Sequence, residues 1–286
     1  MTGLDARLNA YREDLADEKL KGQVEAAHWA KGVASNINVP VASLRKKPDV
    51  HAMQLTQALF GEACFVFEIR NGWAWVQLQE DGYVGYVREE QLANHHTGPT
   101  HRVANVTTWR FPSCDLKAQP ATQLYMNSRV AVDGVNGSFS VLQSGGAIFA
   151  GHLRGLKQFE SDFVNVAERF LHVPYYWGGK TCAGTDCSGL VQISLHACGI
   201  AALRDSDMQE NSLGILIRDH KILQRGDFVF WPGHVGIMQS AAQLLHANGH
   251  FMMVTSEPLT HAIARSEKPV SSVRRLSAQH HIPAAK

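Results

Sequence analysis

Within the first 30 residues, apolar side chains recur three or four positions apart, at Leu4, Leu8, Tyr11 and Leu15. This period matches one face of an α-helix. We therefore expect an N-terminal helical segment over residues 1–30 that packs on a neighbouring domain. After this segment the pattern changes from the period of a helix to that of strands.

Short apolar runs separated by turn residues occupy residues 31–96. The run from Cys64 to Ile69 is followed by Asn71-Gly72, and the run from Trp73 to Leu78 leads to Asp81-Gly82. Asn-Gly and Asp-Gly between apolar runs are signals of β-hairpins. Several short strands at such close spacing predict a small β-barrel.

Residues 97–155 repeat this pattern more weakly, at an offset of 65 or 66 positions. The matching pairs are Leu59-Phe60 with Leu124-Tyr125, Gly72 with Gly137, and Gly85-Tyr86-Val87 with Gly151-His152-Leu153. A repeat of this length predicts a second small barrel in tandem with the first.

The pattern changes again in residues 156–286. A helical apolar face ends before Pro174, and a glycine-rich loop from Trp177 to Gly184 leads into a second helical run that starts near Asp186. Three strand-like runs follow, at Phe228–Trp231, His234–Met238 and Gln243–Ala247. Helices followed by antiparallel strands predict an α+β domain.

Composition narrows the class of protein. The chain has 286 residues, 45% of them hydrophobic and 19% charged, which is typical of a globular protein large enough for a sizeable core. Lys+Arg is 27 and Asp+Glu is 26, so no basic excess points to nucleic acid. No apolar run approaches the roughly 18 residues of a membrane span. The first 20 residues are charged and lack the apolar core of a secretory signal, which predicts a cytoplasmic location and reduced thiols.

The five cysteines are odd in number, so at least one is expected to be a free thiol. Cys187 stands out because it falls at the start of a predicted helix. There the unpaired backbone N–H groups and the helix dipole favour thiolate over thiol, and the same N–H groups can stabilise an oxyanion. Paired strands would bring His234 and His246 together as a general base and its orienting partner.

Each of these features also has a purely structural interpretation. A buried cysteine is more often a small core residue than a nucleophile, and this chain has 15 histidines. Cys182 and Cys187 are poorly spaced for zinc without a second pair, and Gly178-Gly179-Lys180 lacks the spacing of a phosphate loop. We therefore predict no metal and no cofactor. Cys64, Cys114 and Cys198 need no function.

The segments Pro174–Gly179 and Gly184–Val191 together resemble the signature of the NlpC-type cell-wall cysteine peptidases. Matches continue in the family's order at Gly226–Phe230, His234–Ile237 and His246-Ala247, so that the resemblance covers about 125 residues. It implies a papain-like core that cleaves peptidoglycan stem peptides between γ-D-glutamate and the next diamino acid. It also implies Cys187 as nucleophile, His234 as base and His246 as the third polar residue.

Some members of this family carry bacterial SH3-like domains before the catalytic domain, one of which closes over the active site. Phe60-Gly61-Glu62 and Gly82-Tyr83-Val84-Gly85 resemble the segments that bind the free amine of the substrate's L-alanine, which implies Glu62 and Tyr83 as substrate-binding residues. The second barrel has Leu124-Tyr125-Met126-Asn127 instead, which implies a structural role. In the catalytic domain the resemblance implies further substrate-binding residues: Tyr175, Asp186, Ser188, Asp205 and Ser206.

The lead hypothesis is a γ-D-glutamyl–diamino acid endopeptidase that recycles released muropeptides with a free N-terminal L-alanine. Its partner is the peptide L-Ala-γ-D-Glu followed by diaminopimelate or lysine, with no nucleic acid or membrane partner. A carboxylate pocket for the amine would reject a blocked stem, because blocking leaves buried carboxylates unpaired. Two alternatives stay open: a non-catalytic wall-peptide-binding protein, and a thiol amidase or acyltransferase on the same core.

Overall fold

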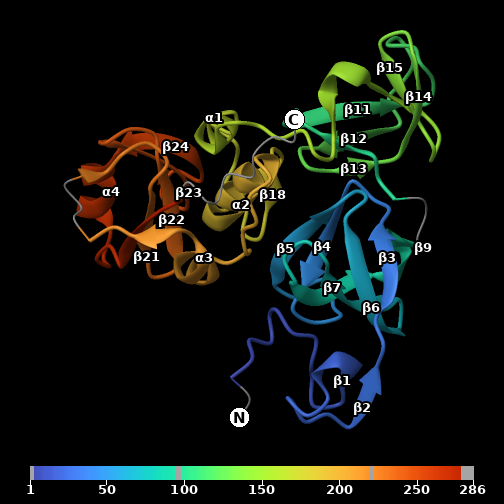
Figure 1. Cartoon of the computed structure of the whole chain (residues 1–286), viewed down its shortest axis with the longest axis horizontal. Coiled ribbons are helices and arrows are strands. Elements are labelled where there is room, and N and C mark those ends of the chain that lie inside the picture. Colours follow the sequence, from blue (N-terminus) through green and yellow to red (C-terminus); the bar gives the residue numbers. More distant parts are fainter. Residues whose placement is uncertain (1–2, 95–97, 219–221, 278–286) are drawn as a thin grey trace. The chain divides into compact units, whose positions relative to one another are not determined.

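The structure is a computed structural model that describes residues 3–94, 98–218 and 222–277. The chain divides into two compact units (Figure 1). Unit 1 consists of Met1–Val103 and Thr108–Leu153, and unit 2 of Ala104–Thr107 and Arg154–Lys286. Unit 1 is built from strands, whereas unit 2 contains the α-helices, and the predicted α+β class is confirmed.

The N-terminal segment contains no α-helix among its described residues, 3–30, so the helix expected over residues 1–30 is wrong. The segment instead holds the strands β1 (Leu15–Asp17) and β2 (His28–Ala30), which pair in parallel, with the 3-10 turn η1 (Glu18–Leu20) between them.

Contacts with the first barrel explain why the segment is not helical. The Val84 N–H donates to the carbonyl of Arg7 at 2.8 Å, and the Gln77 side chain donates to that of Leu8 at 2.8 Å. The Arg12 guanidinium lies 4.3 Å from the Trp75 ring centroid. These carbonyls bond to the barrel rather than within a helix, because partners elsewhere in the chain override a local helical period.

The first barrel is a seven-stranded antiparallel sheet in the order β5-β4-β8-β7-β6-β3-β9. The predicted hairpin at Asn71-Gly72 is confirmed: Arg70 pairs with Trp73, and the two turn residues have φ of 53° and 73°. The elements are β3 (Val33–Ile37), β4 (Val41–Arg45), β5 (Gln54–Leu59), β6 (Ala63–Arg70), β7 (Trp73–Leu78), β8 (Val84–Arg88), η2 (Glu89–Gln91) and β9 (Leu92–Asn94).

The second barrel consists of a three-stranded and a five-stranded sheet around its own apolar core. The sheet orders are β13-β10-β17 and β12-β11-β16-β15-β14. The elements are β10 (His101–Val103), β11 (Thr107–Phe111), β12 (Thr122–Tyr125), β13 (Arg129–Val130), β14 (Val132–Asn136), β15 (Phe139–Leu142), β16 (Ala147–Phe149), η3 (Ala150–His152) and β17 (Leu153–Gly155).

The two barrels touch where the first one turns between β5 and β6. The Arg129 N–H donates to the carbonyl of Phe60 at 2.8 Å. Gly61 has a φ of 77°, and a Cβ at this position would lie 2.1 Å from the Arg129 carbonyl oxygen. This approach requires glycine for both its left-handed backbone and its missing side chain.

Unit 2 centres on a six-stranded antiparallel sheet in the order β20-β25-β21-β22-β23-β24. The strands are β18 (Lys180–Thr181), β19 (Gly184–Thr185), β20 (Ile215–Leu216), β21 (Phe228–Trp231), β22 (His234–Met238), β23 (Gln243–Asn248), β24 (Met253–Pro258) and β25 (Ser272–Arg275). The helices are α1 (Phe163–Glu168), α2 (Cys187–Ala197), α3 (Ser206–Ser212) and α4 (Leu259–Arg265). The three strand-like runs predicted from the sequence are confirmed as β21, β22 and β23.

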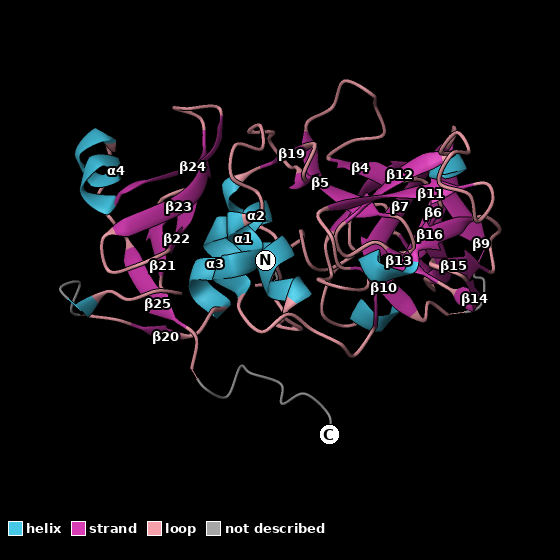
Figure 2. Ribbon diagram, turned by 90° about the horizontal axis from the view of Figure 1, so that it is seen from above, coloured by secondary structure: helices cyan, strands magenta, loops and turns pink. Residues whose placement is uncertain are grey.

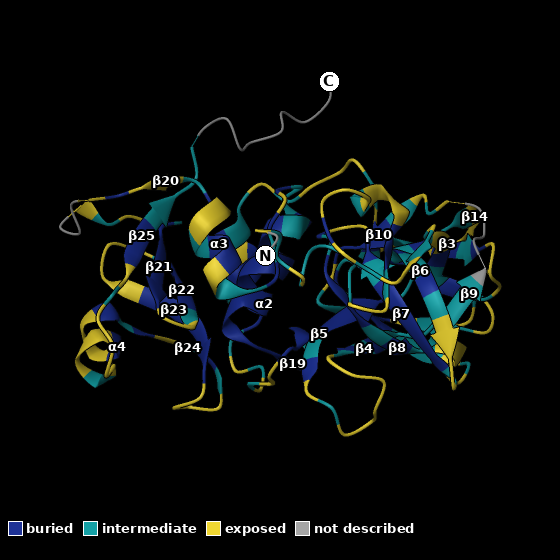
Figure 3. Cartoon of the chain, turned by 90° about the horizontal axis from the view of Figure 1, so that it is seen from below, coloured by how far each residue is buried: buried dark blue, intermediate teal, exposed yellow. Residues whose placement is uncertain are grey.

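Helix α2 is the central helix of this unit and packs on β22 and β23 (Figure 2). All of its residues except His196 are buried, as are most residues of β21 to β23 (Figure 3). It begins after the N-cap Asp186 and ends before Gly199, whose φ is 73°. The helix N-terminus is thereby held against the strands that carry the two histidines.

Candidate active site

Cys187 is the first residue of α2 and is buried. The Asp186 side chain caps the helix, because its Oδ1 accepts from the Gly189 N–H at 2.7 Å. A Cβ on Gly189 would lie 2.3 Å from the Gly179 carbonyl oxygen, so this position requires glycine for close packing against the loop. The local sequence therefore determines both the helix start and the tight approach of the loop beside the thiol.

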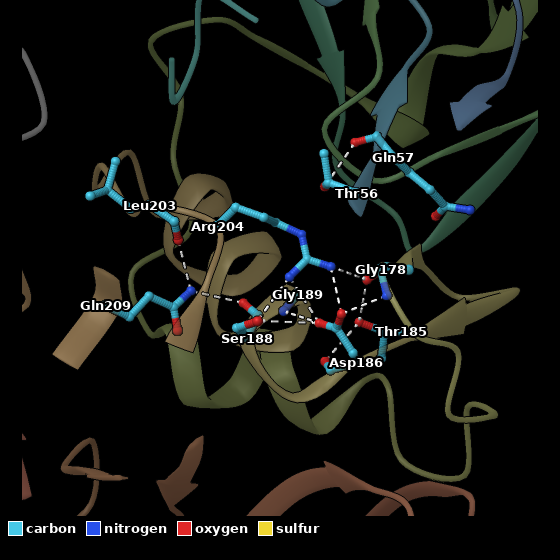
Figure 4. A network of polar contacts seen from close by, with 11 residues as sticks. Thr56, Gln57, Gly178, Thr185, Asp186, Ser188, Gly189, Leu203, Arg204 and Gln209 are labelled. Carbon is cyan, nitrogen blue, oxygen red and sulfur yellow. Dashed lines mark hydrogen bonds and ion pairs between the residues drawn. The ribbon is translucent and has the colours of Figure 1, made fainter. Parts of the chain in front are cut away.

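Asp186, the residue before Cys187, forms a buried ion pair with Arg204 (Figure 4). Arg204 donates to both carboxylate oxygens of Asp186, at 2.9 and 2.8 Å, and also to Ser188 Oγ at 2.8 Å. Asp186 Oδ2 further accepts from the Gly178 N–H at 2.7 Å. Both oxygens of Asp186 are thus engaged inside unit 2, and its predicted role as a substrate ligand stays a prediction.

Sequence reasoning missed Arg204, although it lies beside the predicted Asp205. Its side chain is only 1% exposed. A charged residue is buried this deeply only when it is paired and hydrogen-bonded, and its partner is 18 positions away in the sequence. No local pattern in the sequence marks that pairing.

The two predicted histidines meet at the paired strands β22 and β23. His234 Nε2 lies 2.8 Å from His246 Nδ1. Behind them, His246 Nε2 lies 2.9 Å from Glu257 Oε1 on β24, and Arg265 of α4 pairs with both oxygens of that carboxylate. Glu257 and Arg265 were also missed by sequence reasoning, because only the sheet register places β24 beside β23.

This chain of contacts determines which nitrogen atoms carry protons. The Arg265 guanidinium holds the pKa of Glu257 below its usual range, so its carboxylate accepts the proton of His246 Nε2. A neutral His246 then accepts at Nδ1, and His234 must donate from Nε2. The remaining nitrogen of His234, Nδ1, is left unprotonated, as a general base requires.

Burial disfavours the charged forms of the Cys187 thiol and of the two imidazoles. Removal from water is the main cause that lowers the pKa of His234 to about 3, with the charges of His246 and Arg265 adding to it. Burial also lowers the pKa of His246. The pKa of the Cys187 thiol is raised to about 12, mainly because burial removes the thiol from water and then because the Asp186 charge is close. The thiolate expected from the helix N-terminus alone is therefore not favoured in the resting site.

Two contacts place the thiol near the histidine strand. The backbone of Val235, the residue after His234, forms a hydrogen bond to the Cys187 sulfur. The Tyr175 hydroxyl lies near the Cys187 sulfur. The pKa of Tyr175 is raised mainly by burial and then by its electrostatic interaction with Cys187. Unit 2 thus brings together Cys187, His234, His246 and Tyr175.

The other predicted substrate residues divide between the two units. In unit 2, Ser188 is buried beside Arg204, Asp205 is the residue before α3, and Ser206 begins that helix. In unit 1, Glu62 is buried and accepts from the Leu59 N–H at 2.6 Å, while Tyr83 is also buried.

Over residues 3–94, 98–218 and 222–277, no group of three His, Cys, Asp or Glu side chains is arranged to hold a metal ion. Within the same ranges, no helix is long and apolar enough to cross a lipid bilayer.

Comparison with family models gives two matches. Residues 172–270 match the NlpC/P60 family, and residues 44–92 match the bacterial dipeptidyl-peptidase Sh3 domain. The chain carries an NlpC/P60 domain. This domain includes Cys187, His234 and His246, and the predicted resemblance is confirmed. It also includes Glu257 and Arg265. The Sh3 match contains Glu62 and Tyr83, whereas the second barrel lies outside both matches.

The curated proteins to which the chain is similar are named as peptidases. The chain is 27% identical over 257 residues to dipeptidyl-peptidase 6 of Lysinibacillus sphaericus, covering 79% of this chain and 93% of the relative. It is 26% identical over 244 residues to gamma-D-glutamyl-L-lysine dipeptidyl-peptidase of Bacillus subtilis strain 168, covering 77% and 80%. The matches support a hydrolase of the peptidase class.

The fold is shared with a solved NlpC/P60 family protein from Bacillus cereus ATCC 10987. The TM-score is 0.73 at 21% identity, and the match covers 85% of this chain and 99% of that one. The NlpC/P60 domain therefore has the predicted papain-like fold, and the chain also has the predicted SH3-like N-terminal domain.

Proposed function

We propose that the protein is a cysteine peptidase that hydrolyses the γ-D-glutamyl–diamino acid bond of peptidoglycan stem peptides. The observation that carries the proposal is the buried thiol of Cys187 at the start of α2, a helix that packs on β22, the strand that begins at His234. The names of the Bacillus relatives support a γ-D-glutamyl bond followed by lysine. Diaminopimelate at the same position also fits the proposal.

The reaction begins from a neutral thiol and a neutral imidazole, because burial suppresses both charges. As the Cys187 sulfur attacks the γ-carbonyl carbon, its proton passes to His234 Nδ1. The carbonyl oxygen becomes an oxyanion next to the N-terminus of α2, where backbone N–H groups and the positive end of the helix dipole stabilise it. The C–N bond then breaks, and His234 returns the proton to the leaving amine.

A water molecule completes the cycle. His234 takes a proton from the water, whose oxygen attacks the thioester carbon, and the proton returns to the Cys187 sulfur as the thioester bond breaks. The products are L-Ala-γ-D-Glu and the free diamino acid. Throughout, His246 and Glu257 keep His234 in the tautomer whose Nδ1 faces the reaction, since a misplaced proton would remove the base.

The preference for a free N-terminal L-alanine rests on Glu62, Tyr83 and Asp205. These residues match the amine-binding segments of the family, and Glu62 is a buried carboxylate. A carboxylate attracts a substrate ammonium, and acetylation of the stem removes that positive charge. The proposal is therefore cleavage of released peptides rather than of the intact wall.

The test compares three substrates: the free tripeptide L-Ala-γ-D-Glu-L-Lys, its N-acetylated form, and intact sacculi. We expect mass spectrometry to show L-Ala-γ-D-Glu and lysine from the free peptide. Cleavage of the acetylated form should be at least about 100-fold slower. Cys187→Ala should lower the rate by about 1000-fold or more, while Cys182→Ala, a matched cysteine in the preceding loop, should retain it.

Three results would contradict the proposal. Release of lysine by Cys187→Ala would exclude the nucleophile, and equal rates on free and acetylated peptides would exclude the amine pocket. Tight binding of the tripeptide to the unaltered protein without turnover would instead support a non-catalytic peptide-binding protein.

A further inference from the structure

A pocket of about 240 Å³ in unit 2 adjoins the two histidines. It lies at the end of the sheet where the β21–β22 and β23–β24 hairpins turn, and it extends to the C-terminal end of α4. Its lining includes Tyr175, Trp231, His234, His246, Arg265 and Lys268. The catalytic steps proposed for the thiol and the imidazoles involve neither Trp231 nor Lys268.

The charged side chains that line this pocket are all basic. Arg265 and Lys268 contribute cations, His250 adds an imidazole, and no Asp or Glu is among the described lining residues. Glu257 does not line the pocket, and its carboxylate already pairs with Arg265. The charge of Lys268 is left without a carboxylate partner among the described residues, its amine contacting only the Pro232 carbonyl at 3.5 Å.

The reaction decides which part of the substrate lies here. His234 returns its proton to the leaving nitrogen, so the leaving group must lie on the imidazole side of the scissile bond. This imidazole and His246 both line the pocket. In the proposed reaction the leaving group is a diamino acid, which carries one carboxylate as lysine and two as diaminopimelate.

Resting on that proposed function, we propose that this pocket binds a carboxylate of the leaving diamino acid, with Lys268 as its main cationic partner and Arg265 in support. The carboxylate has two sources: the α-carboxylate of a terminal lysine or diaminopimelate, or the second carboxylate of the diaminopimelate side chain. In a peptide that continues beyond the diamino acid, the α-carboxylate is part of an amide bond. Binding through the α-carboxylate therefore predicts that the substrate ends at the diamino acid, whereas binding through the side-chain carboxylate allows a longer peptide.

Binding can be measured without turnover. The Trp231 side chain lines the pocket, so its indole N–H resonance in ¹⁵N NMR reports occupancy, and Trp231→Phe assigns that resonance. The full-length Cys187→Ala protein is titrated with L-lysine, L-lysinamide and meso-diaminopimelate. We expect saturable shifts with lysine and diaminopimelate if the α-carboxylate binds, or with diaminopimelate alone if the side-chain carboxylate binds. Lysinamide should produce no saturable shift in either case.

The variant Lys268→Gln removes the cation and keeps a polar side chain. We expect it to weaken binding of the carboxylate ligand about fivefold, the size of a partly exposed ion pair. Lys157→Gln, an exposed lysine of the same unit outside the pocket, is the matched control and should bind as the parent does. Equal binding of lysinamide, no saturable shift with any ligand, or an unchanged affinity in Lys268→Gln would overturn the proposal.

A parallel kinetic measurement separates this inference from the proposed function. The unaltered enzyme is given L-Ala-γ-D-Glu-L-Lys and its C-terminal amide, together with the peptide that ends in diaminopimelate. Cleavage without any preference for a carboxylate, with no shift at Trp231, would overturn the pocket and leave the peptidase proposal intact. No cleavage of any peptide, together with saturable carboxylate binding reported by Trp231, would overturn the peptidase proposal and leave the carboxylate-binding pocket intact.

Discussion

Glu257 lies directly behind His246, with 2.9 Å between its Oε1 and the histidine Nε2. Because Arg265 lowers the pKa of this carboxyl, the proton of His246 is drawn to Nε2, and Nδ1 is left as the unprotonated nitrogen of His234. In the proposed reaction, Glu257 is a positioning residue that acts on His234 through His246. It lies on β24, two strands along the chain from β22, the strand of His234.

The variant Glu257→Gln tests this dependence. The glutamine amide can donate as well as accept a hydrogen bond, so it no longer determines which nitrogen atoms of His246 and His234 carry protons. We therefore expect kcat to fall about tenfold with little change in KM. Glu267→Gln, at an exposed position shortly after α4, is the matched control. A change in KM alone would contradict the positioning role, and recovery of kcat in Glu257→Asp would support it.

Loss of the cation from the ion pair between Arg204 and Asp186 is expected to destabilise unit 2. Arg204→Met leaves a buried carboxylate without its cation, which should cost about 3 to 5 kcal/mol of stability. Adding Asp186→Asn removes the stranded charge, so the double variant should be more stable than Arg204→Met alone. Thermal unfolding of the full chain measures both, and equal melting temperatures for all three proteins would contradict the prediction.

The partly buried His234 and the buried His246 predict a loss of stability in acid. The pKa of His234 is lowered from 6.5 to about 3, so below pH 6.5 the unfolded chain binds a proton that the folded chain does not. Stability is therefore fully present above pH 6.5 and falls as the pH drops toward 3, by up to about 1.4 kcal/mol per pH unit for each such histidine. His234→Gln should flatten this fall in denaturant melts, and an identical slope would exclude the histidine as its source.

The raised pKa of Cys187 predicts how the thiol reacts with alkylating agents. Because the thiolate is the reactive form and the pKa is about 12, the rate of modification by iodoacetamide should rise about tenfold per pH unit from pH 6 to 9. Peptide mapping separates Cys187 from the other four cysteines. A plateau already reached near neutral pH would show that the resting site holds a thiolate–imidazolium pair instead.

Several features could be predicted from the sequence because neighbouring residues determine them. Asn71 and Gly72 adopt the left-handed backbone of a tight hairpin wherever two apolar runs flank them. Asp186 caps a helix and places Cys187 at its start through contacts that span only three positions. The predicted strands with His234 and His246 follow from apolar runs of the right length.

Only the tertiary structure decided the rest, because the energies involved depend on partners far apart in the chain. The N-terminal segment has a helical period but bonds to the first barrel. The partners Arg204 and Glu257 acquire their roles through contacts 18 and 11 positions away. Burial also acts on Cys187 against the helix N-terminus: removal from water raises the pKa of the thiol, and only the packed fold determines the size of that desolvation cost.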